Sequence, residues 1–168
     1  MINSVFRTLS LIALLTACFA ISAAPKTVQV HLEGIADGDT IYVRNTETRT
    51  SYRVRLAMID APESKQQYGI EAKAALQQLL RGAGIITLHV EGTDRYGRLI
   101  ALVEDERSRN INLELVNQGA AWVYTQYAQR GAFANLYSTF DNAERQARMR
   151  QIGLWKNPTP VEPWRFRR

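Results

Sequence analysis

The chain has 168 residues, of which 46% are hydrophobic and 22% are charged. These values are typical of a folded protein and exclude wholesale disorder, while 10 Gly and 5 Pro are too few for a collagenous or low-complexity chain. The length suits one domain with a sizeable core. The 21 Lys and Arg against 16 Asp and Glu give a net charge of +5, which favours a polyanionic partner without identifying one.

The N-terminus has the pattern of a secretory signal peptide. A single positive charge at Arg7 precedes an apolar run over residues 9–20, and small residues follow at 22–24. The run is shorter than the ~20 residues that a membrane-spanning helix needs. We therefore expect residues 1–24 to be removed and the mature chain to be secreted or periplasmic. One alternative stays open, because residues 15–18 resemble a bacterial lipobox and a lipidated Cys18 would anchor an envelope lipoprotein.

Hydrophobic periodicity predicts eight elements between the signal peptide and the C-terminal tail. Alternating apolar and polar residues predict strands at 28–32, 40–44 and 52–58. From Glu71 the apolar residues recur at helical spacing up to Gly82 or Gly84. Two further strands are expected at 86–90 and 98–103, then a short helix capped by Asn110 and a longer one over about 133–153. The tail from Asn157 is predicted to be loose and basic.

This order of elements favours an α+β fold. Five short strands with tight connections indicate a closed, antiparallel, five-stranded OB-fold barrel with three helices packed to one side. An open α+β sheet fits the same periodicities. We place the folded domain at 25–156 and the basic C-terminal tail at 157–168. A monomer without a stable protein partner is expected, because no long apolar stripe is left over.

Two acidic segments are candidates for metal binding. Asp39 lies in the turn before a strand, and Asp60 lies just past a strand end. Each segment alone is typical of a solvated turn, but both at one end of a barrel would offer carboxylate oxygens to calcium or magnesium, with a main-chain carbonyl and waters. His31 and His89 each stand alone within a strand pattern, so zinc is not indicated.

Two arginines accompany these acids. Arg55 precedes Asp60 by five residues, and Arg98 follows the polar turn 94–97. Two guanidinium groups beside a divalent ion and a carboxylate are the set that phosphodiester hydrolysis needs, because they neutralise the charge of the pentacoordinate transition state. Arg44 and Arg53 are interpreted as solubilising charges on the strands.

Six segments taken together resemble the staphylococcal nuclease (thermonuclease) family in order and spacing, over residues 28–155. They are Asp-Gly-Asp-Thr at 37–40, Arg-Leu-Ala-Met-Ile-Asp-Ala-Pro-Glu at 55–63, Tyr-Gly-Ile-Glu-Ala at 68–72, Asp-Arg-Tyr-Gly-Arg at 94–98, Asn-Leu-Glu-Leu-Val-Asn-Gln-Gly-Ala at 112–120 and Gly-Leu-Trp at 153–155. The resemblance implies an OB-fold barrel with helices. It also implies a secreted calcium-dependent endonuclease that hydrolyses DNA and RNA, single strands preferred, to 3′-phosphorylated products.

The resemblance also implies residue roles. The implied calcium ligands are Asp39, Asp60 and the backbone carbonyl of Ala61; the implied catalytic residues are the general base Glu63 and the transition-state clamps Arg55 and Arg98; the implied nucleotide contacts are Tyr96 and Tyr127. Many relatives have Thr at the position of Ala61, which a main-chain ligand tolerates. Trp122, Tyr124 and Tyr127 compete for the aromatic positions expected after Gly119.

A non-catalytic alternative belongs to the same fold. An OB-fold module can bind single strands through basic and aromatic surface alone. Such a module is expected to have lost a metal carboxylate, the glutamate or an arginine. Here Asp39, Asp60, Glu63, Arg55 and Arg98 are all present, which favours the enzyme.

Overall fold

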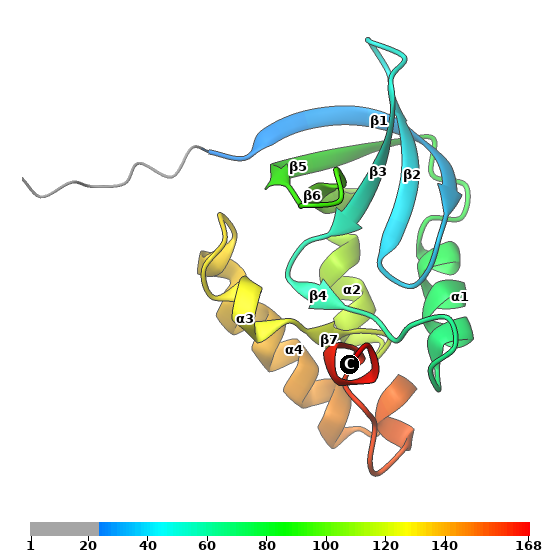
Figure 1. Ribbon diagram of the computed structural model, residues 1–168, viewed down its shortest axis with the longest axis vertical. Helices are drawn as coiled ribbons and strands as arrows, with labels where there is room; N and C mark the ends of the chain where they lie inside the picture. The colour runs from blue at the N-terminus through cyan, green and yellow to red at the C-terminus, as the bar shows by residue number, and fades with distance from the viewer. Residues whose placement is uncertain (1–23) are drawn as a thin grey trace, which may run out of the picture.

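A computed structural model describes residues 24–168, so Cys18 and almost all of the predicted signal peptide lie outside the described residues. Five strands close a barrel in the order β1-β2-β3-β6-β5 (Figure 1). They are β1 (Lys26–Ile35), β2 (Thr40–Asn45), β3 (Ser51–Leu56), β5 (Ile85–Thr93) and β6 (Leu99–Glu104). The predicted α+β fold with a five-stranded OB-fold barrel is confirmed, and the open sheet is excluded.

The barrel is not antiparallel throughout, which corrects the expectation from sequence. Four neighbouring pairs are antiparallel, but β3 and β6 run parallel, with Arg55 opposite Ile100. A closed ring with an odd number of strands cannot alternate direction at every step, so at least one pair has to be parallel. A parallel pair also needs a long crossover, and here the chain makes it through β4 (Ile59–Asp60), α1 (Gly69–Leu79) and β5.

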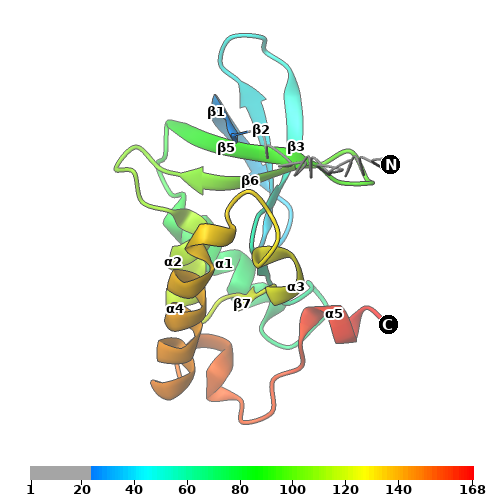
Figure 2. The ribbon, with the colours of Figure 1, turned by 90° about the vertical axis from the view of Figure 1, so that its left-hand side faces the viewer.

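The helices gather at one end of the barrel (Figure 2). In the described part of the chain, three helices have seven or more residues, as predicted: α1, α2 (Ile111–Asn117) and α4 (Tyr137–Met149). The Asn110 side chain accepts a hydrogen bond from the Leu113 amide, which confirms it as the cap of α2. The shorter elements are β7 (Trp122–Val123), α3 (Thr125–Ala128), the 3₁₀ turns η1 (Ala134–Leu136) and η2 (Gly153–Lys156), and α5 (Pro163–Phe166).

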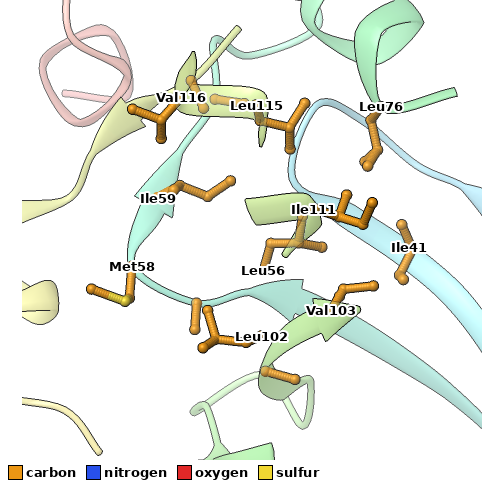
Figure 3. Close-up of a cluster of buried hydrophobic side chains, with 14 of the residues drawn as sticks. Ile41, Leu56, Met58, Ile59, Leu76, Leu102, Val103, Ile111, Leu115 and Val116 are labelled. Atoms are coloured by element: carbon orange, nitrogen blue, oxygen red, sulfur yellow. The ribbon is translucent and has the colours of Figure 1, made fainter. Parts of the chain in front are cut away.

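The core lies between the inner face of the barrel and the helices α1 and α2. Figure 3 shows Ile41 and Leu56 from the strands beside Leu76 and Ile111 from these helices. The alternation along β3 is the reason: Val54 and Leu56 are 0% and 1% exposed, whereas Arg53 is exposed and Arg55 lines the cavity at the barrel end. Burial of these side chains fixes the strand register, since a shift of one residue would exchange the two faces.

The C-terminal segment is basic but not loose, which differs from the expectation for 157–168. Pro163 starts α5 at a position where its missing N–H costs nothing. The Trp164 ring stacks on Tyr124, with centroids 5.1 Å apart and planes 2° apart. Aromatic stacking therefore ties the segment to the loop that follows β7.

Within residues 24–168, no helix is long and apolar enough to cross a membrane.

Candidate active site

A cavity of about 780 Å³ opens between the barrel end, the β4 and α3 loops and the C-terminal segment. All eight residues singled out from the sequence line it. They are Asp39, Arg55, Asp60, Ala61, Glu63, Tyr96, Arg98 and Tyr127. Segments up to 88 residues apart are thus brought to one place by the closure of the barrel.

The pairing of β2 with β3 places Asp39 beside Arg55. Thr40 lies opposite Arg55 in the ladder, and the Leu56 amide donates to the Asp39 carbonyl at 2.8 Å. The Arg55 Nη1 atom lies 2.8 Å from Asp39 Oδ2, and Asp39 Oδ1 accepts a hydrogen bond from the Thr40 hydroxyl. The ion pair is therefore set by strand register.

Asp60 reaches the same guanidinium from the next loop. It lies in β4, opposite Trp122 of β7, and its side chain is 1% exposed. Arg55 Nη2 donates to Asp60 Oδ1 at 2.7 Å. The Ala61 amide donates to Asp39 Oδ2 at 2.8 Å, so the two acidic loops are also joined directly.

Gly38 is what lets these loops approach. A Cβ atom at Gly38 would lie 2.7 Å from the Ala61 Cβ and 2.9 Å from the Ala72 Cβ, both closer than real contacts. A glycine at this position is therefore required by packing, not by backbone torsion. The Ala61 side chain faces Gly38, which explains why its small size suits this chain.

Burial acts against the charged forms of the acidic side chains at this site. Burial raises the pKa of Asp60, and the charge of Asp39 raises it further, against the lowering effect of the guanidinium groups. Burial and the charge of Asp39 likewise raise the pKa of Asp37, which also lines the cavity. Burial alone would lower the pKa of Arg55, but Asp39 and Asp60 outweigh it and raise the pKa. Such a site favours added positive charge.

Arg98 is aimed into the cavity by its own turn. The Asp94 carboxylate accepts the Arg98 Nε–H at 2.7 Å and the backbone N–H groups of Tyr96 and Arg98. The guanidinium carbons of Arg95 and Arg98 lie 4.9 and 5.6 Å from the centroid of the exposed Tyr96 ring. Arg98 is therefore fixed before any ligand arrives.

The structure places the three competing aromatic residues after Gly119 in two different surroundings. Tyr124 and Tyr127 both line the cavity, with ring centroids 4.7 Å apart, and Tyr127 is 59% exposed. Trp122 is instead buried against Trp155, with ring centroids 4.3 Å apart. Their position in the sequence after Gly119 did not show which of the three aromatic residues line the cavity.

Two further arginines border the cavity. Arg53, expected only to solubilise its strand, lines the cavity wall. Arg167 comes from the C-terminal segment and donates to Asp60 and Glu63. Sequence reasoning missed Arg167, because only its basic composition marked that segment.

The donor chemistry of the site fits a hard divalent cation. Asp39 and Asp60 are buried carboxylates on adjoining loops, and the oxygens of such groups are what calcium and magnesium prefer. Among residues 24–168, no group of three or more His, Cys, Asp or Glu side chains is arranged to hold a metal ion. The predicted set needs two carboxylates and a main-chain carbonyl, so it does not depend on such a group.

Comparison with known proteins agrees with this geometry. The model of the family described as "Staphylococcal nuclease homologue" matches residues 53–157. The chain is 38% identical over its whole length to a Haemophilus influenzae protein named "Uncharacterized endonuclease", of which it covers 88%. It is also 38% identical, over 80% of its length, to a Shigella flexneri "Micrococcal nuclease", of which it covers 77%. A protein of Escherichia coli O157:H7, also named "Uncharacterized endonuclease", is 37% identical over 79% of the chain and 80% of that protein. The chain therefore belongs to the staphylococcal nuclease family, whose members depend on a metal ion, and it is a nuclease.

Proposed function

We propose that this nuclease is a calcium-dependent endonuclease that cleaves DNA and RNA, prefers single strands and leaves 3′-phosphates. One observation carries the proposal: two buried carboxylates, two guanidinium groups and a half-exposed glutamate line a single cavity. This is the set that hydrolysis of a phosphodiester needs.

Asp39 and Asp60, with the Ala61 carbonyl, would hold the calcium ion. When bound, calcium neutralises charge on the phosphate and lowers the pKa of a nearby water. Asp39 is held in place by Thr40 and by the Ala61 amide, so its orientation does not depend on the ion.

Glu63 and the two arginines would act on the phosphate directly. The Glu63 carboxylate takes a proton from the attacking water, whose oxygen forms the new bond to phosphorus. Arg55 and Arg98 donate to the phosphate oxygens as negative charge develops in the pentacoordinate transition state. The bond from phosphorus to the 5′-oxygen breaks, that oxygen takes up a proton from solvent water, and the phosphate stays on the 3′-oxygen.

The aromatic side chains favour an unpaired substrate. Tyr96 is 67% exposed and Tyr127 is 59% exposed, and both line the cavity that holds Asp60 and Arg55. Exposed rings stack on bases of any identity, and a base is available for stacking only when it is not within a duplex. This supports single strands of both DNA and RNA as substrates.

The direct test is digestion of heat-denatured DNA, native DNA and RNA by the purified protein, with calcium, with magnesium and with chelator. We expect cleavage with calcium, faster on denatured DNA than on native DNA, and none with chelator. Treatment of the products with a 3′-phosphatase should change their gel mobility. Full activity in chelator would contradict the roles of Asp39 and Asp60.

We also propose export to the periplasm or the medium, supported by the charged start, the apolar run and the small residues at 22–24. A monomer is proposed because the predicted elements leave no long apolar stripe over. Mass spectrometry of the mature N-terminus tests the cleavage site, and light scattering tests the oligomeric state. A diacylated Cys18 in the membrane fraction would replace export with an anchored lipoprotein.

A further inference from the structure

The C-terminal segment occupies the same groups that the proposed chemistry uses. Arg167 donates from Nη2 to Asp60 Oδ2 at 2.7 Å and from Nη1 to Asp60 Oδ1 at 3.1 Å. Its Nη1 also donates to Glu63 Oε1 at 2.5 Å. A single side chain from the end of the chain thus bridges a proposed metal ligand and the proposed general base.

The carboxylate of Asp60 has no room left in this arrangement. Oδ1 accepts from both Arg55 and Arg167, Oδ2 accepts from Arg167, and the side chain is 1% exposed. Arg55 engages Oδ1, so Oδ2 is the oxygen that a calcium ion would use, and Arg167 Nη2 occupies Oδ2 at 2.7 Å. The charge of a calcium ion at Oδ2 would also be repelled by the Arg167 guanidinium. Binding of Arg167 and binding of a cation to Asp60 therefore exclude one another.

The same segment packs on aromatic residues beside the cavity. The Trp164 ring stacks on Tyr124, which lines the cavity, with ring centroids 5.1 Å apart, and it meets the Trp122 ring edge-on with centroids 5.8 Å apart. Aromatic packing therefore holds the segment against the loop that follows β7.

A small number of further contacts attach the segment to the rest of the molecule. Gln66 Nε2 donates to the Val161 carbonyl at 2.5 Å, and Asn157 Nδ2 donates to Gln67 Oε1 at 2.8 Å. Within α5 only Pro163 is buried, and Phe166 is 46% exposed. Apart from Trp164, which packs against the cluster of Trp122 and Trp155, the segment buries little, so its release costs far less than unfolding of the barrel. Figure 2 shows α5 at the edge of the molecule, outside the helical layer.

We propose that residues 161–168 form an autoinhibitory arm: Arg167 keeps the cation from Asp60 and engages Glu63, and the enzyme becomes competent when calcium and a nucleic acid strand displace the arm. This inference rests on the proposed function, because it assumes that Asp60 binds the ion. The apparent calcium affinity is the affinity of the open state multiplied by the fraction of molecules in which the arm is open. An arm that is closed in nine molecules of ten therefore weakens calcium binding about tenfold.

Calcium titration by isothermal calorimetry tests the arm on the full chain. We expect Arg167→Ala and Trp164→Ala each to bind calcium about tenfold more tightly than the wild type. Arg165→Ala is the matched control: it removes the same charge from the same segment, but within residues 24–168 Arg165 pairs only with Glu162, at 3.3 Å, and its side chain is 68% exposed. It should bind calcium as the wild type does. Trp164→Ala changes no charge, so its effect separates release of the arm from simple electrostatics.

Hydrogen exchange provides a readout without turnover. The amides of Phe166 and Arg167 donate to the carbonyls of Glu162 and Pro163 in α5. In the wild type, saturating calcium with a short single-stranded oligonucleotide carrying uncleavable linkages should speed exchange in the peptide that contains residues 161–168. In Trp164→Ala this exchange should be fast from the start.

The outcomes separate the arm from the proposed function. Equal calcium affinity in wild type and Arg167→Ala, or weaker affinity in Arg167→Ala, overturns the arm while leaving a calcium enzyme in place. Tighter binding in Arg167→Ala but not in Trp164→Ala also overturns it, because the effect would then be one of charge alone. If no variant binds calcium or cleaves denatured DNA, the proposed function fails and the arm falls with it.

Discussion

The turns at the two ends of β6 are built alike, but only one of them faces the cavity. The first turn spans 94–98 and the second spans 105–109. In each, the aspartate Oδ1 accepts the backbone N–H groups two and four residues later, and Oδ2 accepts the arginine Nε–H at 2.7 Å. The fourth residue has a positive φ in both, 78° at Gly97 and 57° at Ser108.

The difference between the turns is their place in the fold. Arg98 lines the cavity and its side chain is 18% exposed, whereas Arg109 is 45% exposed and does not line it. The second turn instead leads into α2, which Asn110 caps. Identical local chemistry therefore fixes an arginine rigidly, and the end of the barrel at which it stands decides whether it meets a substrate.

The largest effect expected from this comparison is on catalysis. Arg98→Ala should lower kcat/KM by roughly 10²–10³-fold, because it removes a preorganised donor to the transition state. Arg109→Ala, the matched control, should stay within a fewfold of the wild type. Both are measured on one single-stranded oligonucleotide at fixed salt, since phosphate contacts make binding salt-dependent.

Arg98→Lys sharpens the same test. A lysine keeps the charge but lacks the bidentate fork, so it should not restore activity. Near-normal activity in Arg98→Lys would reduce the role of Arg98 to electrostatic attraction. Equal losses in Arg98→Ala and Arg109→Ala would end the distinction between the two turns.

The second turn leads into α2, and we expect a residue of this helix, Asn112, to be important for stability. Asn112 is fully buried in α2; its Nδ2 donates to the carbonyls of Ala57 and Ala101, and its Oδ1 accepts the Val103 amide. Asn112→Ala leaves buried backbone groups without partners and should cost about 3 kcal/mol of unfolding free energy.

Urea unfolding measures this cost, with an unchanged slope as the sign that the same structure unfolds. Asn117→Ala at the exposed end of the same helix serves as the control and should lie within about 0.5 kcal/mol of the wild type. A loss below 1 kcal/mol in Asn112→Ala would mean that water replaces the missing bonds.

Local patterns predicted the parts of this molecule that depend on local chemistry. Alternation along residues 52–56 gave the strand and its faces, and Asn110 gave the start of α2. The spacing of the family's motifs predicted that Asp39, Arg55 and Asp60 belong to one site. This prediction is possible because strand register and a tight turn set the separation of these residues. The parallel pairing of β3 with β6 was missed, since it follows from closing an odd ring and not from any segment alone.

Contacts between distant segments were beyond such reasoning. Arg167 meets Asp60 across 107 residues, and nothing in the basic tail distinguishes it from the neighbouring Arg165. Arg53 was likewise interpreted as a surface charge, because a strand pattern shows which face a side chain is on but not what lies opposite. The sequence therefore predicted the site residues that lie in local motifs, whereas the contacts between distant segments became visible only in the structure.

A smaller effect is expected from the two turn aspartates. Burial alone would raise the pKa of Asp94 and of Asp105, but hydrogen bonds from their own turns, including the arginine, lower both on balance. Asp94→Asn and Asp105→Asn should each lose about 1 kcal/mol of stability at pH 7. Only Asp94→Asn should also lower kcat/KM, roughly tenfold, because Arg98 loses its anchor.

The pH dependence has a definite sign. A carboxyl whose pKa is lowered by folding stabilises the folded state above its unfolded pKa of about 3.9, and this contribution disappears as the pH falls through the lower folded value. Thermal unfolding of wild type and both variants should therefore differ at pH 7 and converge below about pH 4. A gap that widens on acidification would contradict the assigned hydrogen bonds.

The smallest effect concerns the residue with positive φ in each turn. Ser108 adopts a left-handed conformation that costs a residue with a side chain about 1 kcal/mol, and glycine removes this strain while adding freedom to the unfolded chain. Ser108→Gly should thus gain about 0.5 kcal/mol, and Gly97→Ser should lose about as much. A Cβ atom at Gly97 meets nothing within 4 Å, so no clash obscures the backbone effect. Calorimetry should show Tm shifts of about 1–2 °C in opposite directions. Shifts of the same sign would show that the two turns, despite their matching hydrogen bonds, are not equivalent in the strain that their backbones carry.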